Sequence, residues 1–80
     1  MRKAYVLIHT LFGKEEQVAE ALRCRPEVVA ADVVSGPYDV IAVLEGRDAN
    51  AIAKAILSEM PIMDGVGSIT CCLVISRNSE

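Results

Sequence analysis

Apolar residues recur along the chain in two spacings, one typical of strands and one typical of helices. Four segments are dense in apolar, β-branched and aromatic residues and predict strands. These segments are residues 3–10, 28–35, 39–45 and 68–76. Two segments between them, residues 14–25 and 48–60, place apolar residues three and four positions apart and predict helices. The predicted order along the chain is therefore βαββαβ.

Both predicted helices have recognisable ends and one apolar stripe. Pro26 and Pro61 follow them, and a proline restricts the residue before it to extended backbone. Asp48 precedes the second helix, where its carboxylate is expected to cap a free N–H group of the first turn. The stripe residues are Val18, Ala21, Leu22 and Arg25 in the first helix, and Ala49, Ile52, Ala53, Ile56, Leu57 and Met60 in the second. Each stripe predicts a helix that covers one face of a sheet.

The two halves of the chain look like two copies of one βαβ unit. A single shift along the sequence aligns Gly13 with Asp48, Leu22 with Leu57, Pro26 with Pro61, Val6 with Ile41 and Ile8 with Val43. Right-handed crossovers then place both helices on one face of a four-stranded antiparallel sheet. The predicted fold class is α+β, with the ferredoxin-like βαββαβ topology. We expect residues 1–80 to form a single domain.

The sheet face away from the helices is also expected to be apolar. An antiparallel sheet with one wet face alternates apolar and polar residues. In the first strand, however, Val6 and Ile8 lie on one face while Tyr5 and Leu7 lie on the other. An exposed apolar patch of that size is rare on a monomer. We therefore expect a homodimer in which the sheet faces cover each other, as in a dimeric α/β barrel.

Composition agrees with a partner subunit and excludes several classes of protein. Apolar residues make up 52% of a chain of 80 residues, whose own core is small. The net charge is −3 and the basic residues are spread along the sequence, so direct nucleic-acid binding is not expected. No apolar run approaches the roughly 18 residues that span a bilayer. A cytoplasmic location without membrane contact is expected.

Cysteine and histidine give no metal or catalytic pattern. Cys24, Cys71 and Cys72 lack the spacing of a metal-binding loop, and we expect them to be small buried apolar residues. His9 ends the first strand on the face away from the helices. No acid or nucleophile lies near it in the sequence to activate it. No metal, cofactor or catalytic residue is therefore predicted.

A turn between the second and third strands places polar groups at one end of the sheet. The candidate ligand-binding residues are Gly36, Pro37, Tyr38 and Asp39 in this turn, and Ser68 and Thr70 in the last strand. Backbone N–H groups of such a turn can bind a carboxylate, and Asp39 can bind an ammonium group. Ser68 and Thr70 lie two residues apart, so their hydroxyls share one face of the strand. From the residues alone, the turn is either a site for a small amino acid or only a corner of the chain.

These residues are similar to those of a known family. Residues 35–40 resemble the Gly-x-Tyr-Asp hairpin of the Lrp/AsnC effector domain, which is also called the RAM domain. Residues 4–10 and 68–71 resemble the first and last strands of that domain. Ser68 stands where the family usually has the first threonine of Thr-x-Thr. Full family members also carry an N-terminal helix-turn-helix domain, and this chain resembles the stand-alone members that lack it.

The resemblance implies a function in transcription regulation without direct DNA binding. Family members dimerise through their sheets, and the dimers assemble into rings, often octamers or decamers. Effector amino acids bind between neighbouring dimers, near the hairpin and the last strand. The resemblance thus implies a module that binds a small amino acid or related metabolite, and that can co-assemble with full-length Lrp/AsnC regulators.

Two other classes of protein share the predicted fold. A small cofactor-free enzyme of the dimeric α+β barrel type would use His9 or Tyr38 as acid or base, in a cavity between sheet and helices. An ACT-like regulatory domain would also bind an amino acid at an interface, and Gly13 is compatible with it. The fold alone does not distinguish these two hypotheses from an Lrp/AsnC domain. The Gly-Pro-Tyr-Asp turn favours the Lrp/AsnC domain.

Overall fold

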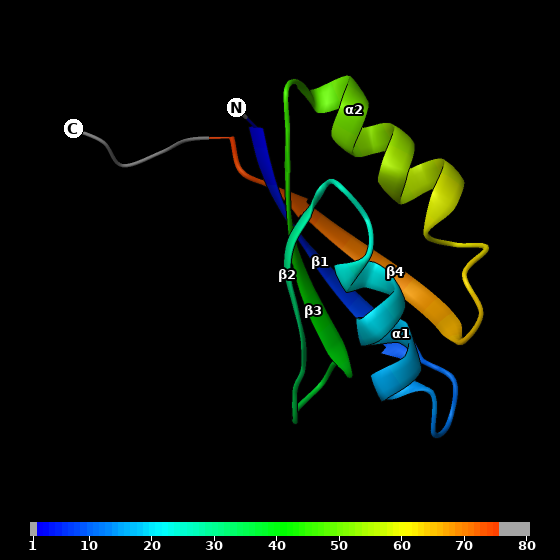
Figure 1. Cartoon of the computed structure of the whole chain (residues 1–80). Coiled ribbons are helices and arrows are strands. Elements are labelled where there is room, and N and C mark those ends of the chain that lie inside the picture. Colours follow the sequence, from blue (N-terminus) through cyan, green and yellow to red (C-terminus); the bar gives the residue numbers. More distant parts are fainter. Residues whose placement is uncertain (1, 76–80) are drawn as a thin grey trace.

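Strands and helices alternate in the order βαββαβ in the computed structural model, which describes residues 2–75 (Figure 1). The strands are β1 (Arg2–Thr10), β2 (Val28–Val33), β3 (Val40–Gly46) and β4 (Val66–Leu73). The helices are α1 (Glu15–Arg23) and α2 (Ala49–Lys54), and α2 continues into the π-helical turn η1 (Ala55–Glu59). Each predicted strand overlaps an observed one. Ser76, the predicted end of the last strand, lies outside the described residues.

The four strands form one antiparallel sheet in the order β2-β3-β1-β4. Strand β1 is therefore central and pairs with β3 on one side and β4 on the other. Both helices lie over the same face of the sheet (Figure 1). The predicted ferredoxin-like fold is confirmed. Within residues 2–75, every helix is too short or too polar to cross a bilayer.

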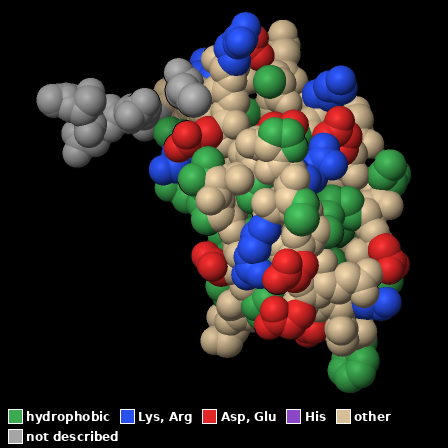
Figure 2. Space-filling model, in the orientation of Figure 1, with side chains coloured by type: hydrophobic (Ala, Val, Ile, Leu, Met, Phe, Trp, Pro, Cys, Tyr) green, Lys and Arg blue, Asp and Glu red, His purple; other side chains and the backbone are tan. Residues whose placement is uncertain are grey.

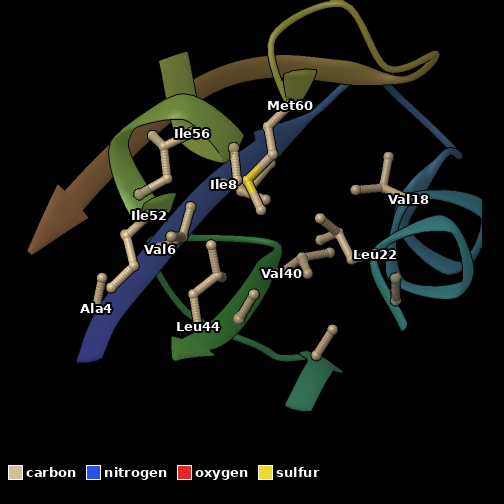
Figure 3. Packing of buried hydrophobic residues seen from close by; sticks show 14 residues of the cluster. Ala4, Val6, Ile8, Val18, Leu22, Val40, Leu44, Ile52, Ile56 and Met60 are labelled. Carbon is tan, nitrogen blue, oxygen red and sulfur yellow. The ribbon is translucent and has the colours of Figure 1, made fainter. Parts of the chain in front are cut away.

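The core lies between the helices and the inner face of the sheet, which is the face that they cover. Side chains of α1, α2 and η1 point toward those of the two central strands (Figure 3). The largest fully buried side chains are Val6, Ile8, Val18, Leu22, Val40, Leu44, Ile52 and Met60. Asp48 caps α2 as predicted, because its Oδ1 accepts a hydrogen bond from the backbone N–H of Ala51 at 3.0 Å.

The buried stripe of α1 differs from the predicted one by one residue. Val18, Ala19 and Leu22 are buried, whereas Ala21 is exposed. Because successive residues are about 100° apart around a helix, Ala19 lies on one flank of this stripe and Ala21 lies beyond the other. Arg25 follows the end of α1, and its guanidinium forms ion pairs with two glutamates, Glu27 and Glu59.

The predicted stripe of the second helix is partly wrong: Ile52, Ile56 and Met60 are buried, whereas Ala53 and Leu57 are exposed. The backbone N–H of Met60 donates to the carbonyl of Ala55 at 3.0 Å, which closes a wider π-type turn. Ala55, which was not in the predicted stripe, is also buried, three residues after Ile52 as α-helical spacing allows. Leu57, which was expected in the core, is 75% exposed.

The proposed internal repeat holds for the order of elements but not for the strand residues. Val6 lies on the inner face of β1 and pairs with Ala42, whereas Ile41, its equivalent in the repeat, lies on the outer face of β3. A difference of one residue reverses the face of every side chain in a strand. The shift that aligns Pro26 with Pro61 therefore aligns strand residues that lie on opposite faces of the sheet, and a shift that differed by one residue would be needed in the strands.

Gly67 is the extra residue of a bulge where β4 passes β1. His9 pairs with Ser68 and Thr10 pairs with Val66, so Gly67 has no partner in the register. A Cβ atom on Gly67 would lie 2.9 Å from the backbone oxygen of His9. Only glycine permits this close approach of two backbones.

We predict that Gly67→Ala destabilises the fold by about 1–3 kcal/mol, because the two strands must move apart. Urea unfolding at a fixed protein concentration measures this change. Ser68→Ala, one residue along the same strand, is the control and should unfold near the urea midpoint of the parent. Equal midpoints for all three proteins would contradict the close approach.

Candidate functional site

The turn between β2 and β3 is fastened to the end of β1 through Asp39. The backbone N–H of Asp39 donates to the carbonyl of Ile8 at 3.0 Å, and the N–H of Val34 donates to the carbonyl of Asp39 at 2.9 Å. Gly36 has a φ of +132°, which disfavours any residue with a Cβ atom. Gly36 and Pro37 themselves are exposed. The turn thus has a fixed base and an exposed tip.

The carboxylate of Asp39 extends the pairing of β1 and β3 by one step. Its Oδ2 accepts a hydrogen bond from the backbone N–H of Thr10 at 2.9 Å and a longer one from the Thr10 hydroxyl at 3.4 Å. Among residues 2–75, Oδ1 of Asp39 accepts no hydrogen bond. One carboxylate oxygen therefore has a structural role, and the other is available to a ligand.

The ring of Tyr38 lies against the ring of His9. Their centroids are 4.7 Å apart and the rings are inclined by 34°. This contact covers part of Tyr38, which is half-buried, whereas His9 is exposed. Aromatic rings at this separation attract each other and hold each other's orientation. The contact between the two rings thus holds the turn against the end of β1.

Ser68 and Thr70 reach the same outer face from the other side of β1. In the register of β1 with β4, Ser68 is opposite His9 and Thr70 is opposite Leu7. The predicted pairing of the two hydroxyls on one face is thus observed. They are nevertheless separated from Tyr38 by the whole width of β1, because β3 and β4 are not neighbours.

His9 and Thr10 also lie at this end of the sheet but were not among the predicted ligand-binding residues, and His9 was considered only as a catalytic group. Both residues lie on β1, between the turn and β4. His9 contacts Tyr38, and Thr10 donates hydrogen bonds to Asp39. The alternation along residues 3–10 does place His9 on the outer face. That Tyr38 and Ser68 lie on either side of His9 follows only from the strand order, which brings distant segments of the chain next to β1.

The centre of the outer face is apolar. Tyr5 pairs with Val43 and Leu7 pairs with Ile41 across the two central strands. Tyr5 remains 41% exposed, and the other three are half-buried. We call these four residues the outer apolar patch. The patch agrees with the expectation that this face is apolar, and it adjoins His9 and Thr70.

The three cysteines are exposed free thiols, so the expectation that they are buried was wrong. Cys72 lies on the outer face of the edge strand β4, opposite Tyr5. Cys71 lies on the inner face of the same edge strand and is exposed. Partial burial, and to a lesser degree the neighbouring Cys72 thiol, raise the pKa of Cys71. A thiol with a raised pKa is a poor nucleophile near neutral pH.

An apolar groove of about 330 Å³ lies on the helix side of β4. It is lined by Ile56, Leu57, Pro61, Val66, Gly67, Ser68, Ile69 and Cys71. An enzyme of the α+β barrel type needs a polar group in a cavity between the sheet and the helices. His9 and Tyr38 do not line this groove. The groove therefore lacks the acid or base that the enzyme hypothesis assigned to it.

Charges of both signs are interspersed over the helical side of the molecule (Figure 2). No basic stripe for nucleic acid is seen in this view. Within the described part of the chain, no three His, Cys, Asp or Glu side chains lie close enough together to hold a metal ion. The polar groups at the end of the outer face suit hydrogen bonding to a small ligand.

The fold and this arrangement agree with a small ligand-binding regulatory domain. Residues 3–80 match the family model described as the Lrp/AsnC ligand-binding domain. The chain belongs to this family, and the resemblance seen in the sequence is confirmed.

Relatives of the chain include regulators of transcription. A helix-turn-helix-type transcriptional regulator of Pyrococcus abyssi is 30% identical over 73 residues, which are 91% of this chain and 46% of that protein. The chain therefore spans less than half the length of this relative.

Solved structures share the fold. A hypothetical protein from Pyrococcus horikoshii has a TM-score of 0.89 and 31% identity, with 96% of this chain and 93% of that chain covered. A transcriptional regulator of Neisseria meningitidis, solved in complex with L-methionine, has a TM-score of 0.81 and 20% identity. That comparison covers 99% of this chain and 53% of the regulator.

Proposed function

We propose that this chain is an effector-binding and assembly module in transcription regulation, and that it binds a small amino acid. The observation that carries the proposal is that Tyr38 and Ser68 lie on either side of His9 on the outer face, with Thr70 two residues further along β4. The turn residues Gly36 and Pro37 border the same end. The family, and the methionine complex of the Neisseria relative, support an amino acid as ligand.

The available groups suit the two charged ends of an amino acid. The free Oδ1 of Asp39 is an acceptor for the ammonium group. The hydroxyls of Tyr38, Ser68 and Thr70 are donors for the carboxylate. Recognition of both ends would distinguish an amino acid from a simple amine or acid, since each unmatched polar group weakens binding. No chemical reaction is part of the proposal.

The outer apolar patch is the proposed dimer surface. Two copies that cover Tyr5, Leu7, Ile41 and Val43 remove apolar area from water on both subunits. Polar residues border the patch, with Lys3 opposite Glu45 at one end and His9 opposite Ser68 at the other. Such a polar rim around an apolar centre is typical of protein interfaces.

A ligand at the end of this face lies near a seam between subunits. We propose that dimers assemble further into a ring of the octameric or decameric type, and that the effector changes the preferred assembly. The effector can do so only if its affinity differs between the two states. Full-length Lrp/AsnC regulators, which share this domain, are the proposed protein partners.

Native mass spectrometry with a panel of the twenty amino acids tests the proposal. We expect dimers or multiples of dimers without ligand, and a changed mass distribution with at least one amino acid. L-methionine is the first member of the panel because of the Neisseria complex. A monomer would remove the assembly part of the proposal. An unchanged distribution and an unchanged melting temperature with all twenty would remove the ligand part.

A further inference from the structure

His9 occupies the position at which the two halves of the proposed site meet. It is the only histidine of the chain. Its ring contacts Tyr38 on the side of β3, with 4.7 Å between the centroids, and its register partner on the side of β4 is Ser68. A ligand that touched both Tyr38 and Ser68 would have to pass over His9.

The imidazole of His9 is held in place without using its hydrogen-bonding atoms. The Tyr38 ring supports it by stacking, and neither ring nitrogen forms a hydrogen bond with any residue of the described range 2–75. The Tyr38 and Ser68 hydroxyls likewise form none there. The side chains of His9, Tyr38 and Ser68 can thus all donate hydrogen bonds, and they lie together on the same exposed face.

The turn itself offers fewer donors than its sequence indicated. Pro37 has no N–H group. The N–H of Asp39 is used by the carbonyl of Ile8, at 3.0 Å. A carboxylate bound beside the turn can use the remaining backbone N–H groups of the turn, and the imidazole of His9 adds an N–H donor on the outer face.

We propose that His9 binds the carboxylate of the effector and so completes the site between Tyr38 and Ser68. This inference rests on the proposed function, because it names a contact within the same site. Hydrogen bonds between a carboxylate and an imidazole N–H are of the strong, charge-assisted kind. Asp39, whose Oδ1 faces no partner in residues 2–75, remains the group for the ammonium end.

The single histidine gives a direct spectroscopic test on the unmodified protein. With histidine labelled with ¹³C at Cε1, the imidazole gives one signal from each equivalent subunit. The first probe is an equimolar mixture of the twenty L-amino acids. The second is the mixture of their α-carboxamides, which lack the carboxylate. We expect the first mixture to shift the His9 signal and the second to leave it unchanged. No shift with the acids, or equal shifts with both mixtures, would overturn the proposal.

Two substitutions separate a hydrogen bond from a structural role. His9→Phe keeps a ring against Tyr38 but removes both nitrogens, and His9→Gln keeps a donor but removes the ring. We expect His9→Phe to lower the affinity for the amino-acid mixture about tenfold, since a charge-assisted hydrogen bond is lost. His9→Gln should stay within about threefold of the parent. The reverse order would show that only stacking matters.

Failure of this inference can be told from failure of the proposed function. If the acid mixture changes the native mass distribution or the melting temperature while the His9 signal stays fixed, a ligand binds without His9. The proposed function then stands and this inference falls. If the mixture changes none of these quantities, this inference falls together with the ligand part of the proposed function.

Discussion

Leu7→Glu should convert the assembly into monomers. Leu7 lies at the centre of the outer apolar patch, opposite Ile41 on β3 and Thr70 on β4. In a single chain the new carboxylate can reach water, because this face carries no helix. In the proposed dimer it would be covered by the partner sheet, and burial of an unpaired charge costs several kcal/mol.

The symmetry of a dimer doubles this effect. A two-fold interface contains both copies of the substituted residue, so two carboxylates lose their hydration together. The dimer affinity should fall by at least roughly a thousandfold. Sedimentation velocity over a range of protein concentrations measures the change.

Leu57→Glu is a matched control for this experiment. It makes the same substitution at a leucine that is 75% exposed on η1, on the opposite side of the sheet. We expect it to sediment as the parent does. A Leu7→Glu protein that remained as associated as Leu57→Glu would show that another surface holds the subunits together.

Asp39→Ala should abolish amino-acid binding while the dimer stays intact. The substitution removes the acceptor proposed for the ligand ammonium. It also leaves the N–H of Thr10 without the oxygen that lies 2.9 Å away. Loss of that partner should lower the free energy of unfolding by about 1–3 kcal/mol.

Asp39→Asn separates these two roles. Its amide oxygen can still accept the hydrogen bond from Thr10, so the stability should remain near that of the parent. It carries no charge, so the affinity for the amino acid should fall about tenfold or more. Calorimetry with the amino acids that shift the native mass, together with urea unfolding, measures both quantities. Equal affinities of Asp39→Asn and the parent would restrict Asp39 to its structural role.

The fold follows from the sequence because the spacing of apolar residues is a property of each segment by itself. Four segments dense in apolar and β-branched residues, with the two proline-ended helices between them, were enough to predict βαββαβ and the ferredoxin-like sheet. The stripe of the second helix was predicted with the wrong flank, because α-helical spacing allows either Ala53 and Leu57 or Ala55 to lie beside Ile52 and Ile56.

The candidate site was less accessible to prediction, because it depends on pairings between distant segments. Tyr38 and Asp39 were recognisable from a local turn, and Ser68 and Thr70 from alternation within one strand. Nothing local shows that His9 lies between them, or that Thr10 takes one oxygen of Asp39. These contacts require the strand order and the register, which include a one-residue bulge at Gly67.

The central position of β1 also has a consequence for the order of folding. Its register with β4 pairs Ala4 with Leu73, so the first strand of the chain pairs with the last. Contacts between residues so far apart in sequence form slowly, because a long loop must close first. During synthesis, β1 keeps one edge unpaired until β4 has left the ribosome. The pairing of β1 with β4, which includes His9 and Ser68, is then the last of the sheet to form, and ligand binding there would report that all four strands have paired.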